Sequence, residues 1–306
     1  MLLSHMPRGF LPLLMVVIMA GASACTKKAA PNPPATTASP AIAKSADDKL
    51  PADENAWPAG IDPSKLDAFK RKVFDQVVNH EPSACGKGHS LLHSLKRDSA
   101  CRASFYAVRY VARLADGGFT ESEIGEKVAQ RFRAPHVPYI DVSQAPSKGA
   151  TSGRVTIVEF ADYECKHCKE AQAVMQPLLA SYANDVTLYF KHFPISSNNA
   201  LNAANAASAA QTQGKFWQYS DKVWENSDDL TPAVLESIAK EIGLDFSRWY
   251  GDVGSEANRG RVQRDKTEAR SLEIRRTPAL FINGRRYTDE VDLPSLKDWV
   301  DEELGR

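Results

Sequence analysis

The chain has 306 residues, of which 43% are hydrophobic and 25% are charged, and its formal net charge at pH 7 is zero. This apolar content is sufficient for a packed core. Lys, Arg, Asp and Glu are interspersed without a polybasic stretch, which argues against a nucleic-acid-binding protein.

The first 24 residues have the pattern of an export signal. Arg8 supplies a positive start, an apolar stretch covers residues 10–20, and small residues at 21–24 lead to Cys25. The apolar stretch is too short for a membrane-spanning helix, which needs about 20 residues. We therefore expect the chain to be exported.

Small residues directly before a lone cysteine resemble a bacterial lipoprotein signal. The resemblance implies that Cys25 becomes the lipidated first residue and anchors the protein to a membrane. Thr26 stands where inner-membrane lipoproteins have Asp, which favours the outer membrane. Ordinary signal cleavage, which would leave Cys25 as a free thiol, is the alternative, and it also exports the chain.

Residues 25–59 hold the lipidation site and then a segment rich in Ala, Pro, Thr, Ser and Lys without an apolar period. Such a composition cannot bury a core, so we predict a disordered tether between the anchor and the folded part of the chain.

Residues 60–135 are predicted to form a small all-helical domain. One helix begins at Asp62-Pro63, with Asp as its N-cap and Pro in its first turn. A second helix covers about residues 100–114, and a third opens at the capping box that starts with Thr120. The apolar side chains expected to face inward are Leu66, Phe69, Val73, Phe74, Val77, Val78, Phe105, Val108, Val111, Leu114, Ile124 and Val128.

The chain has five cysteines, and an even set remains once Cys25 is assigned to the processing site. In an exported chain this set indicates disulfides, with Cys85 paired to Cys101 and Cys165 paired to Cys168. A Cys85–Cys101 bridge would enclose about 15 residues and stabilise the helical domain by roughly 3 kcal/mol. We predict a structural disulfide here, and a second redox pair that relays electrons to Cys165 is the alternative.

Residues 136–306 alternate between strand and helix patterns, which predicts an α/β domain. Strands are expected at 155–160, 186–190 and 279–282, with a hairpin turn after the last. Helices are expected at 166–182, 200–211, 216–224, 232–242 and 255–274, and again from residue 293. The helices between about 195 and 275 form an insertion, whose core the aromatic residues Phe216, Trp217, Tyr219 and Trp224 should fill; a peptide-binding groove is the alternative for them.

Cys165 and Cys168 stand three residues apart directly behind the first of these strands. Two thiols at a strand-to-helix junction can close a disulfide and open it again by exchange. The helix that follows directs its unpaired amides and positive dipole end at Cys165, and Lys166 and His167 add positive charge. All of these effects favour the thiolate, which is the nucleophile.

A metal site is the alternative for the same residues. Cys165, His167 and Cys168 supply three ligands, whereas a structural zinc site has four in a tetrahedral arrangement. We therefore expect no metal and no organic cofactor, because the cysteine pair itself carries the two electrons.

The segment Val158-Glu159-Phe160-Ala161-Asp162-Tyr163-Glu164-Cys165-Lys166-His167-Cys168 resembles the active-site region of the DsbA-family oxidoreductases. Lys191-His192-Phe193-Pro194, the helical insertion and Arg276-Thr277-Pro278 followed by Ala279-Leu280-Phe281-Ile282-Asn283-Gly284 resemble later parts of that family in the same order. The resemblance covers about residues 137–306 and implies a thioredoxin-like fold with a helical insertion, preceded here by the small all-helical domain.

The resemblance also implies roles for individual residues. Cys165 attacks and Cys168 resolves, while Thr277 and a cis Pro278 hold an extended substrate chain. His167 would tune the redox potential as in the oxidising members, although Lys166 replaces their usual proline. Glu159 lies on an otherwise apolar strand, where it is either a buried proton shuttle for the resolving cysteine or a solvent-facing residue.

Residues ~80–133 faintly resemble the CcmH-type helical domain of cytochrome c maturation. The shared features are the segment around Cys85, the Cys101 helix and the Thr120 helix. That family carries a CxxC motif, and Pro82 occupies the place of its first cysteine. The resemblance implies apocytochrome c thiol handling as a narrower function.

Together these patterns predict an exported, lipid-anchored periplasmic thiol–disulfide oxidoreductase that oxidises dithiols through Cys165 and Cys168. A disulfide isomerase or reductase is the nearest alternative, followed by a noncatalytic lipoprotein adaptor and a metal carrier. The expected partners are exported cysteine-containing proteins and a membrane redox protein that resets the cysteine pair.

Overall fold

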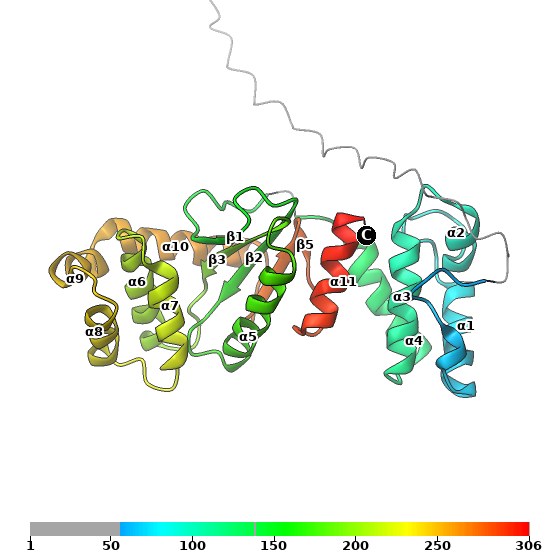
Figure 1. Ribbon diagram of the computed structural model, residues 1–306, viewed down its shortest axis with the longest axis horizontal. Helices are drawn as coiled ribbons and strands as arrows, with labels where there is room; N and C mark the ends of the chain where they lie inside the picture. The colour runs from blue at the N-terminus through cyan, green and yellow to red at the C-terminus, as the bar shows by residue number, and fades with distance from the viewer. Residues whose placement is uncertain (1–55, 138, 306) are drawn as a thin grey trace, which may run out of the picture. The chain divides into compact units, whose positions relative to one another are not determined.

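The computed structural model describes residues 56–137 and 139–305 (Figure 1). The predicted signal at 1–24, the lipidation site Cys25 and the tether as far as residue 55 lie outside the described residues. All described residues belong to the larger of two compact units, Ser45–Arg306.

The N-terminal part is entirely helical. Its elements are η1 (Pro63–Lys65), α1 (Ala68–His80), α2 (Leu91–Arg97), α3 (Ala103–Asp116), α4 (Glu121–Val128) and the π-helical turn η2 (Ala129–Arg133). They enclose one hydrophobic cluster, in which Phe74, Val77, Val111 and Ile124 are buried. The predicted capping box at the start of α4 is present, because Thr120 and Glu123 cap each other's backbone amides.

Three details of this part differ from the prediction. Asp62 caps only a single 3-10 turn, and α1 begins at Ala68, where Asp67 accepts hydrogen bonds from two amides of the first helical turn. Phe69 was expected to face inward, but it lies in the first turn of α1 and is 74% exposed. The short helix α2 was not predicted.

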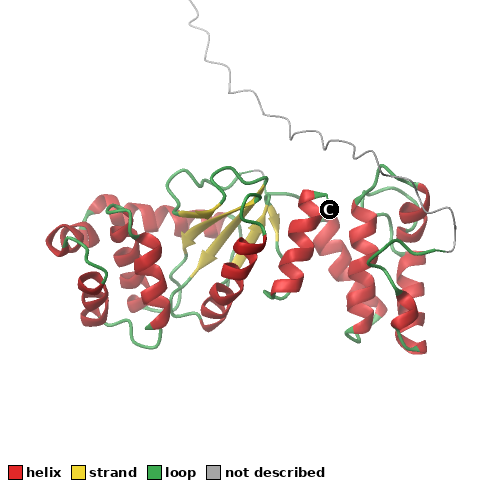
Figure 2. Cartoon of the chain, in the orientation of Figure 1, coloured by secondary structure: helices red, strands yellow, loops and turns green. Residues whose placement is uncertain are grey.

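The second part is built on a five-stranded sheet with the strand order β1-β3-β2-β4-β5 (Figure 2). The strands are β1 (Ser147–Gly149), β2 (Val155–Ala161), β3 (Val186–His192), β4 (Ala279–Ile282) and β5 (Arg285–Arg286). The central pair, β2 and β3, is parallel, and the other neighbours are antiparallel. β1 was missed, because a three-residue strand with polar side chains has no readable alternation.

Helices cover both faces of the sheet. On one face, α5 (Lys166–Ser181) and α11 (Leu293–Leu304) pack on alternate residues of β2 and β3, with Leu178 and Trp299 fully buried. On the other face, Ala269 of α10 (Glu256–Ser271) joins Phe160 and Phe281 in a second cluster. This arrangement places the β2–α5 junction at the carboxyl end of the middle strand of the sheet.

The insertion comprises α6 (Asn198–Gln211), α7 (Phe216–Glu225), α8 (Pro232–Glu241) and α9 (Phe246–Gly254), which lie together beside the sheet (Figure 1). α9 was not predicted as a separate helix. Phe216, Tyr219 and Trp224 are buried in the cluster that these helices enclose, as expected, and the alanines of α6 let the neighbouring helices approach closely.

A buried ionic cluster joins the helical part to the second part. Arg131 is 2% exposed, and its guanidinium group lies 3.2 Å from Asp289, 2.9 Å from Asp298 and 2.8 Å from Glu302. Because one buried cation is shared by three largely buried carboxylates, charge contributes to holding the two parts together.

The predicted fold class, a thioredoxin-like α/β fold with a helical insertion preceded by an all-helical part, is confirmed. The exact domain boundaries at 59/60 and 135/136 stay predictions. Within the described ranges, none of the helices has the length and apolar character that crossing a membrane requires.

Candidate active site

The two cysteines of the motif lie at the junction between β2 and α5. Cys165 is the N-cap of α5 and is partly exposed, whereas Cys168 lies in the first turn and is fully buried. Both are free thiols in this structure. The amide of Cys168 donates to the Cys165 sulfur at 3.4 Å, so the first turn of the helix is directed at this sulfur.

The surroundings of the two thiols shift their pKa values in opposite directions. Hydrogen bonds from the Cys168 thiol, from Thr277 and from the amides of Cys168 and His167 lower the pKa of Cys165 to about 6, although partial burial opposes this. Burial holds the pKa of Cys168 far above its ordinary value. Cys165 is therefore a thiolate at neutral pH, while Cys168 keeps its proton.

Glu159 is fully buried, which excludes the solvent-facing alternative, while its role as a proton shuttle stays a prediction. It occupies the β2 face that α5 covers, and its carboxylate accepts hydrogen bonds from the Gln172 side chain, at 2.9 Å to each oxygen. Burial raises the pKa of Glu159 to about 7, and Gln172 opposes the rise. A negative charge on Glu159 in turn raises the pKa of Cys168, so this acid and the buried thiol are electrostatically linked.

The loop before β4 faces the exposed thiol. The Thr277–Pro278 peptide bond is cis, and the Cys165 sulfur lies 3.2 Å from the Thr277 carbonyl oxygen, to which it donates when it is protonated. Thr277 and Pro278 are both partly exposed beside the sulfur. The structure thus brings Cys165, Cys168, Glu159, Thr277 and Pro278 into one site.

The side chains of Lys166 and His167, which follow Cys165 in the chain, both lie close to Glu170. The His167 side chain is 78% exposed and lies 3.1 Å from Glu170, and the Lys166 side chain is 85% exposed and 3.8 Å from the same carboxylate. The backbone amide of His167, rather than its ring, is what contributes to the low pKa of Cys165. A tuning role for the ring stays a prediction.

Sequence reasoning missed Asp162, which fixes the shape of the site. This residue is 1% exposed, and its carboxylate accepts from the amide of Glu164 at 2.9 Å and from the amides of Ile195 and Ser196 at 2.8 Å each. It therefore ties the loop before Cys165 to the loop after β3. An Asp directly after a strand, able to bond the amide two residues on, was the available signal.

Tyr163 was also missed as a support of the site. Its ring centroid lies 4.5 Å from that of Trp224, and its hydroxyl donates to Ser220 at 2.9 Å. Both partners belong to α7 of the insertion, so the segment that leads into Cys165 is anchored in the insertion's core.

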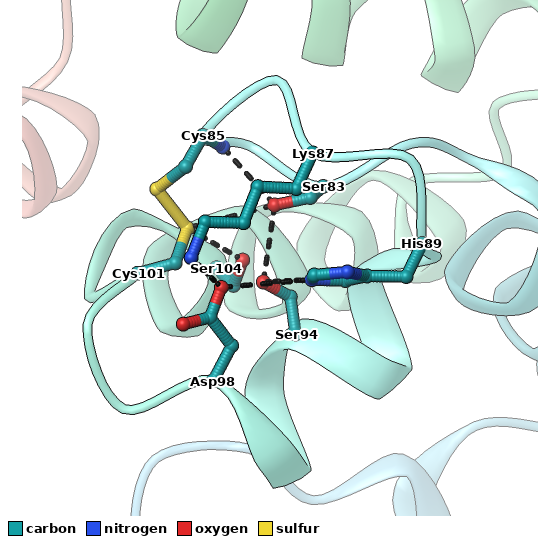
Figure 3. The surroundings of a disulfide bond; sticks show 8 residues. All are labelled: Ser83, Cys85, Lys87, His89, Ser94, Asp98, Cys101 and Ser104. Carbon is teal, nitrogen blue, oxygen red and sulfur yellow. Dashed lines mark hydrogen bonds and ion pairs between the residues drawn. A yellow bond between two sulfur atoms is a disulfide. The ribbon is translucent and has the colours of Figure 1, made fainter.

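The remaining cysteine pair lies in the helical part, where the structure joins Cys85 and Cys101 in a disulfide (Figure 3). Among the residues at 56–137 and 139–305, no three His, Cys, Asp or Glu side chains are grouped so that they could hold a metal ion. Cys25 lies outside the described residues, so its predicted lipidation stays a prediction.

A family model described as thioredoxin matches residues 142–302, which is more than half of the chain. Among solved structures, a thioredoxin-like oxidoreductase from Silicibacter pomeroyi DSS-3 has a TM-score of 0.50 and 28% identity, covering 58% of this chain and 98% of that protein. The oxidised form of BdbD from Bacillus subtilis has a TM-score of 0.49 and 22% identity, covering 54% and 96%.

Curated relatives match over about half of the chain. The Na(+)/H(+) antiporter NhaA 3 of Salinispora tropica is 32% identical over 159 residues, which are 51% of this chain and 24% of the antiporter. The antiporter NhaA of Herminiimonas arsenicoxydans is 33% identical over 170 residues, which are 55% and 27%. The chain therefore spans about a quarter of the length of these relatives.

The matches confirm the resemblance to thioredoxin-fold oxidoreductases expected from the dithiol motif and the Thr277–Pro278 loop. The family match does not reach residues ~80–133, and their CcmH-like resemblance stays a prediction. The chain belongs to the thioredoxin family, whose model residues 142–302 match.

Proposed function

We propose that this chain is an exported enzyme that oxidises dithiols in other exported proteins through Cys165 and Cys168. The observation that carries the proposal is the contrast between the two sulfurs: Cys165 is accessible and acidic, and Cys168 is buried and holds its proton. Such a pair attacks at one sulfur and resolves at the other.

The reaction begins with Cys165 and Cys168 joined as a disulfide. A substrate thiolate attacks Cys165, the bond between the cysteines breaks, and the electron pair leaves on Cys168. The second substrate thiolate then attacks the substrate sulfur of the mixed disulfide and releases Cys165 as a thiolate. Two electrons have passed from the substrate, which gains a disulfide, to the cysteine pair, which becomes a dithiol.

Glu159 and Gln172 serve the buried sulfur in this scheme. Cys168 must take up a proton when it leaves, since burial disfavours its thiolate. Glu159 has a pKa of about 7 and lies on the strand beneath α5, so it can give or take a proton near neutral pH. Gln172 keeps both carboxylate oxygens oriented.

Substrate binding falls to the loop of Thr277 and Pro278. Both residues are partly exposed next to Cys165, where an extended chain can pair with the backbone of residue 277 in a strand-addition mode. In the free protein the Thr277 carbonyl oxygen accepts from Cys165. A substrate chain paired with the backbone of residue 277 would therefore lie next to the reactive sulfur.

The oxidising direction rests on the acidity of Cys165. The disulfide form contains no thiolate. Interactions that stabilise the Cys165 thiolate therefore favour the reduced form of the pair and make the disulfide a stronger oxidant. A pKa of about 6 in place of 9 contributes at most about 30 mV at pH 7, less what solvent screens at this half-exposed sulfur. His167 adds to this when protonated.

The cellular setting follows from the sequence pattern at 1–25. We place the protein in the periplasm, lipid-anchored through Cys25, with the outer membrane favoured by Thr26. A membrane redox protein resets the dithiol to the disulfide. Mass spectrometry of the mature N-terminus tests the anchor, and a Cys25→Ala variant should be released from membranes.

Refolding of reduced ribonuclease and reduction of insulin test the enzyme. Wild-type protein should speed refolding and Cys165→Ser should abolish the effect. Unchanged turnover in the mutant would remove the catalytic proposal and leave a noncatalytic adaptor. A redox potential as low as that of reductases, with insulin reduction faster than refolding, would favour the reductase or isomerase alternative. Proteins trapped as mixed disulfides by a Cys168→Ala variant identify the substrates.

A further inference from the structure

The Cys85–Cys101 disulfide presents its two ends differently (Figure 3). Cys85 is exposed, whereas Cys101 is 3% exposed and lies beneath it in the hydrophobic cluster of the helical part. An incoming thiolate can therefore reach only the Cys85 sulfur.

The loop around Cys85 leaves room for a partner. Gly86, Lys87 and Gly88 are all exposed, and a Cβ atom added to either glycine would meet no atom within 4 Å. With small residues beside it and open space around them, the backbone of another protein can approach the sulfur closely.

The buried sulfur is surrounded by hydroxyl groups. Ser104 Oγ lies 3.1 Å and Ser83 Oγ 3.7 Å from Cys101 Sγ, and both serines are fully buried. α3 begins two residues after Cys101, so its unpaired amides and positive dipole end lie near this sulfur. Hydrogen bonds to a charged sulfur are stronger than those to a neutral one, so this environment favours a thiolate at Cys101.

The hydroxyls continue toward the surface. Ser83 Oγ lies 3.0 Å from Ser94 Oγ, which lies 3.3 Å from the Nε2 atom of His89. The His89 side chain is 30% exposed and also lies 3.5 Å from Asp98. A proton can therefore pass between solvent and the interior of the cluster without a change of fold.

We propose that Cys85–Cys101 is a second thiol–disulfide exchange centre, opened by attack at Cys85. The partner is a protein with an exposed dithiol. Its thiolate bonds to Cys85, the Cys85–Cys101 bond breaks, and the electron pair leaves on Cys101, held by the hydroxyls of Ser104 and Ser83. The partner's second thiolate then attacks its own sulfur in the mixed disulfide and releases Cys85. The partner becomes a disulfide and this chain gains a dithiol.

The centre is independent of the active site proposed above, and it is tested in a full-length variant with serine at positions 25, 165 and 168. Dithiothreitol is the probe, and alkylation followed by mass spectrometry reads the two thiols. We expect the bond to be reduced in native buffer while the circular dichroism of the protein stays unchanged. A bond that dithiothreitol opens only after guanidinium has unfolded the protein would overturn the proposal and leave a purely structural disulfide.

Two serine variants in the same background test the stabilised leaving group. Ser104→Ala should slow reduction about tenfold, as expected for a lost hydrogen bond to a charged group. A tenfold decrease in the equilibrium constant for reduction of the disulfide would lower the redox potential by about 30 mV. Ser208→Ala is the control, because Ser208 is as buried as Ser104 but bonds Arg261 and contacts neither sulfur, and it should leave both values unchanged. Equal effects of both variants would contradict the assigned role.

The site of attack is tested with oxidised glutathione. Cys101→Ala should form a mixed disulfide at Cys85 rapidly, whereas Cys85→Ala should leave the buried Cys101 unmodified over the same time. Modification at equal rates, or faster at Cys101, would show that exchange does not begin at the exposed sulfur.

Discussion

Gln172 holds Glu159 in place: its side-chain amide donates to both carboxylate oxygens at 2.9 Å, from a position one helical turn beyond Cys168. The carboxylate is fully buried, so this amide replaces part of the hydration that the acid has lost. The amide thereby sets how readily the acid exchanges a proton with its surroundings.

Replacing Gln172 should raise the pKa of Glu159. The Gln172→Leu variant keeps the side chain's size but removes the hydrogen bonds that oppose the effect of burial, so the pKa should rise above about 7. We expect the pH profile of the mixed-disulfide resolution step to shift to higher pH. Gln176→Leu on the exposed side of the same helix is the control. If both variants keep the wild-type profile, Gln172 does not position the acid.

Glu159 should make the reduced protein less stable at higher pH. Its pKa is about 7 in the folded protein against 4.5 in the unfolded chain, so the folded state binds this proton more tightly. Its contribution is complete below about pH 4.5 and is lost as the pH rises through 7, and the whole change amounts to roughly 3 kcal/mol.

Urea unfolding of the reduced protein at a series of pH values measures this effect. The Glu159→Gln variant, which cannot ionise, should lack the decline between pH 4.5 and pH 7. If the unfolding free energy of Glu159→Gln falls with pH in parallel with that of the wild type, other groups cause the decline.

The acidity of Cys165 should depend on the hydrogen bond from Cys168. This bond is the largest of the contributions that lower the pKa of Cys165 to about 6. In Cys168→Ala the pKa should rise toward 9, whereas Cys168→Ser keeps a hydrogen-bond donor and should titrate close to the wild type. Ultraviolet absorbance of the thiolate follows both titrations. An alanine variant that still titrates near 6 would point to the helix amides as the main cause.

Arg131 should be needed for the stability of the whole described part. Arg131→Met leaves three buried carboxylates without their shared cation, although Arg113, Arg109 and Arg285 each still pair with one of them. We therefore expect a loss at the lower end of the range of about 3–5 kcal/mol that is typical of a broken buried ion pair. Arg154 is the matched control: it pairs with Asp185 at 3.2 Å but its side chain is 62% exposed, so Arg154→Met should cost less than about 1 kcal/mol. Urea unfolding compares the two, and similar losses would show that the buried cluster contributes nothing special.

Much of the fold could be predicted because it follows from local patterns. The apolar run of β2, the capping box at Thr120 and the Asn283-Gly284 turn each occur where the sequence indicates them. The elements that were missed, β1, α2 and α9, are short, and tertiary contacts rather than periodicity determine them. The start of α1 was misplaced because two Asp caps, at 62 and 67, compete within six residues.

The site was only partly predictable for a different reason. A recognisable sequence pattern contains Cys165, Cys168, Thr277 and Pro278. Such a motif does not specify the direction in which each side chain points. The ring of His167 lies against Glu170, a contact that the motif does not indicate, and its expected tuning of Cys165 stays a prediction. Gln172 lies four residues after Cys168, on the same helical face, so helical spacing could have suggested it once Glu159 was known to be buried.

The anchoring of Tyr163 in α7 has a consequence for anyone who wishes to shorten this protein. Excising residues 195–275 to leave a minimal redox module would strip this tyrosine of both Trp224 and Ser220 and expose its ring just two residues before the reactive sulfur. The insertion thus supports the loop that carries Cys165, and deleting it would also disturb the reactive site.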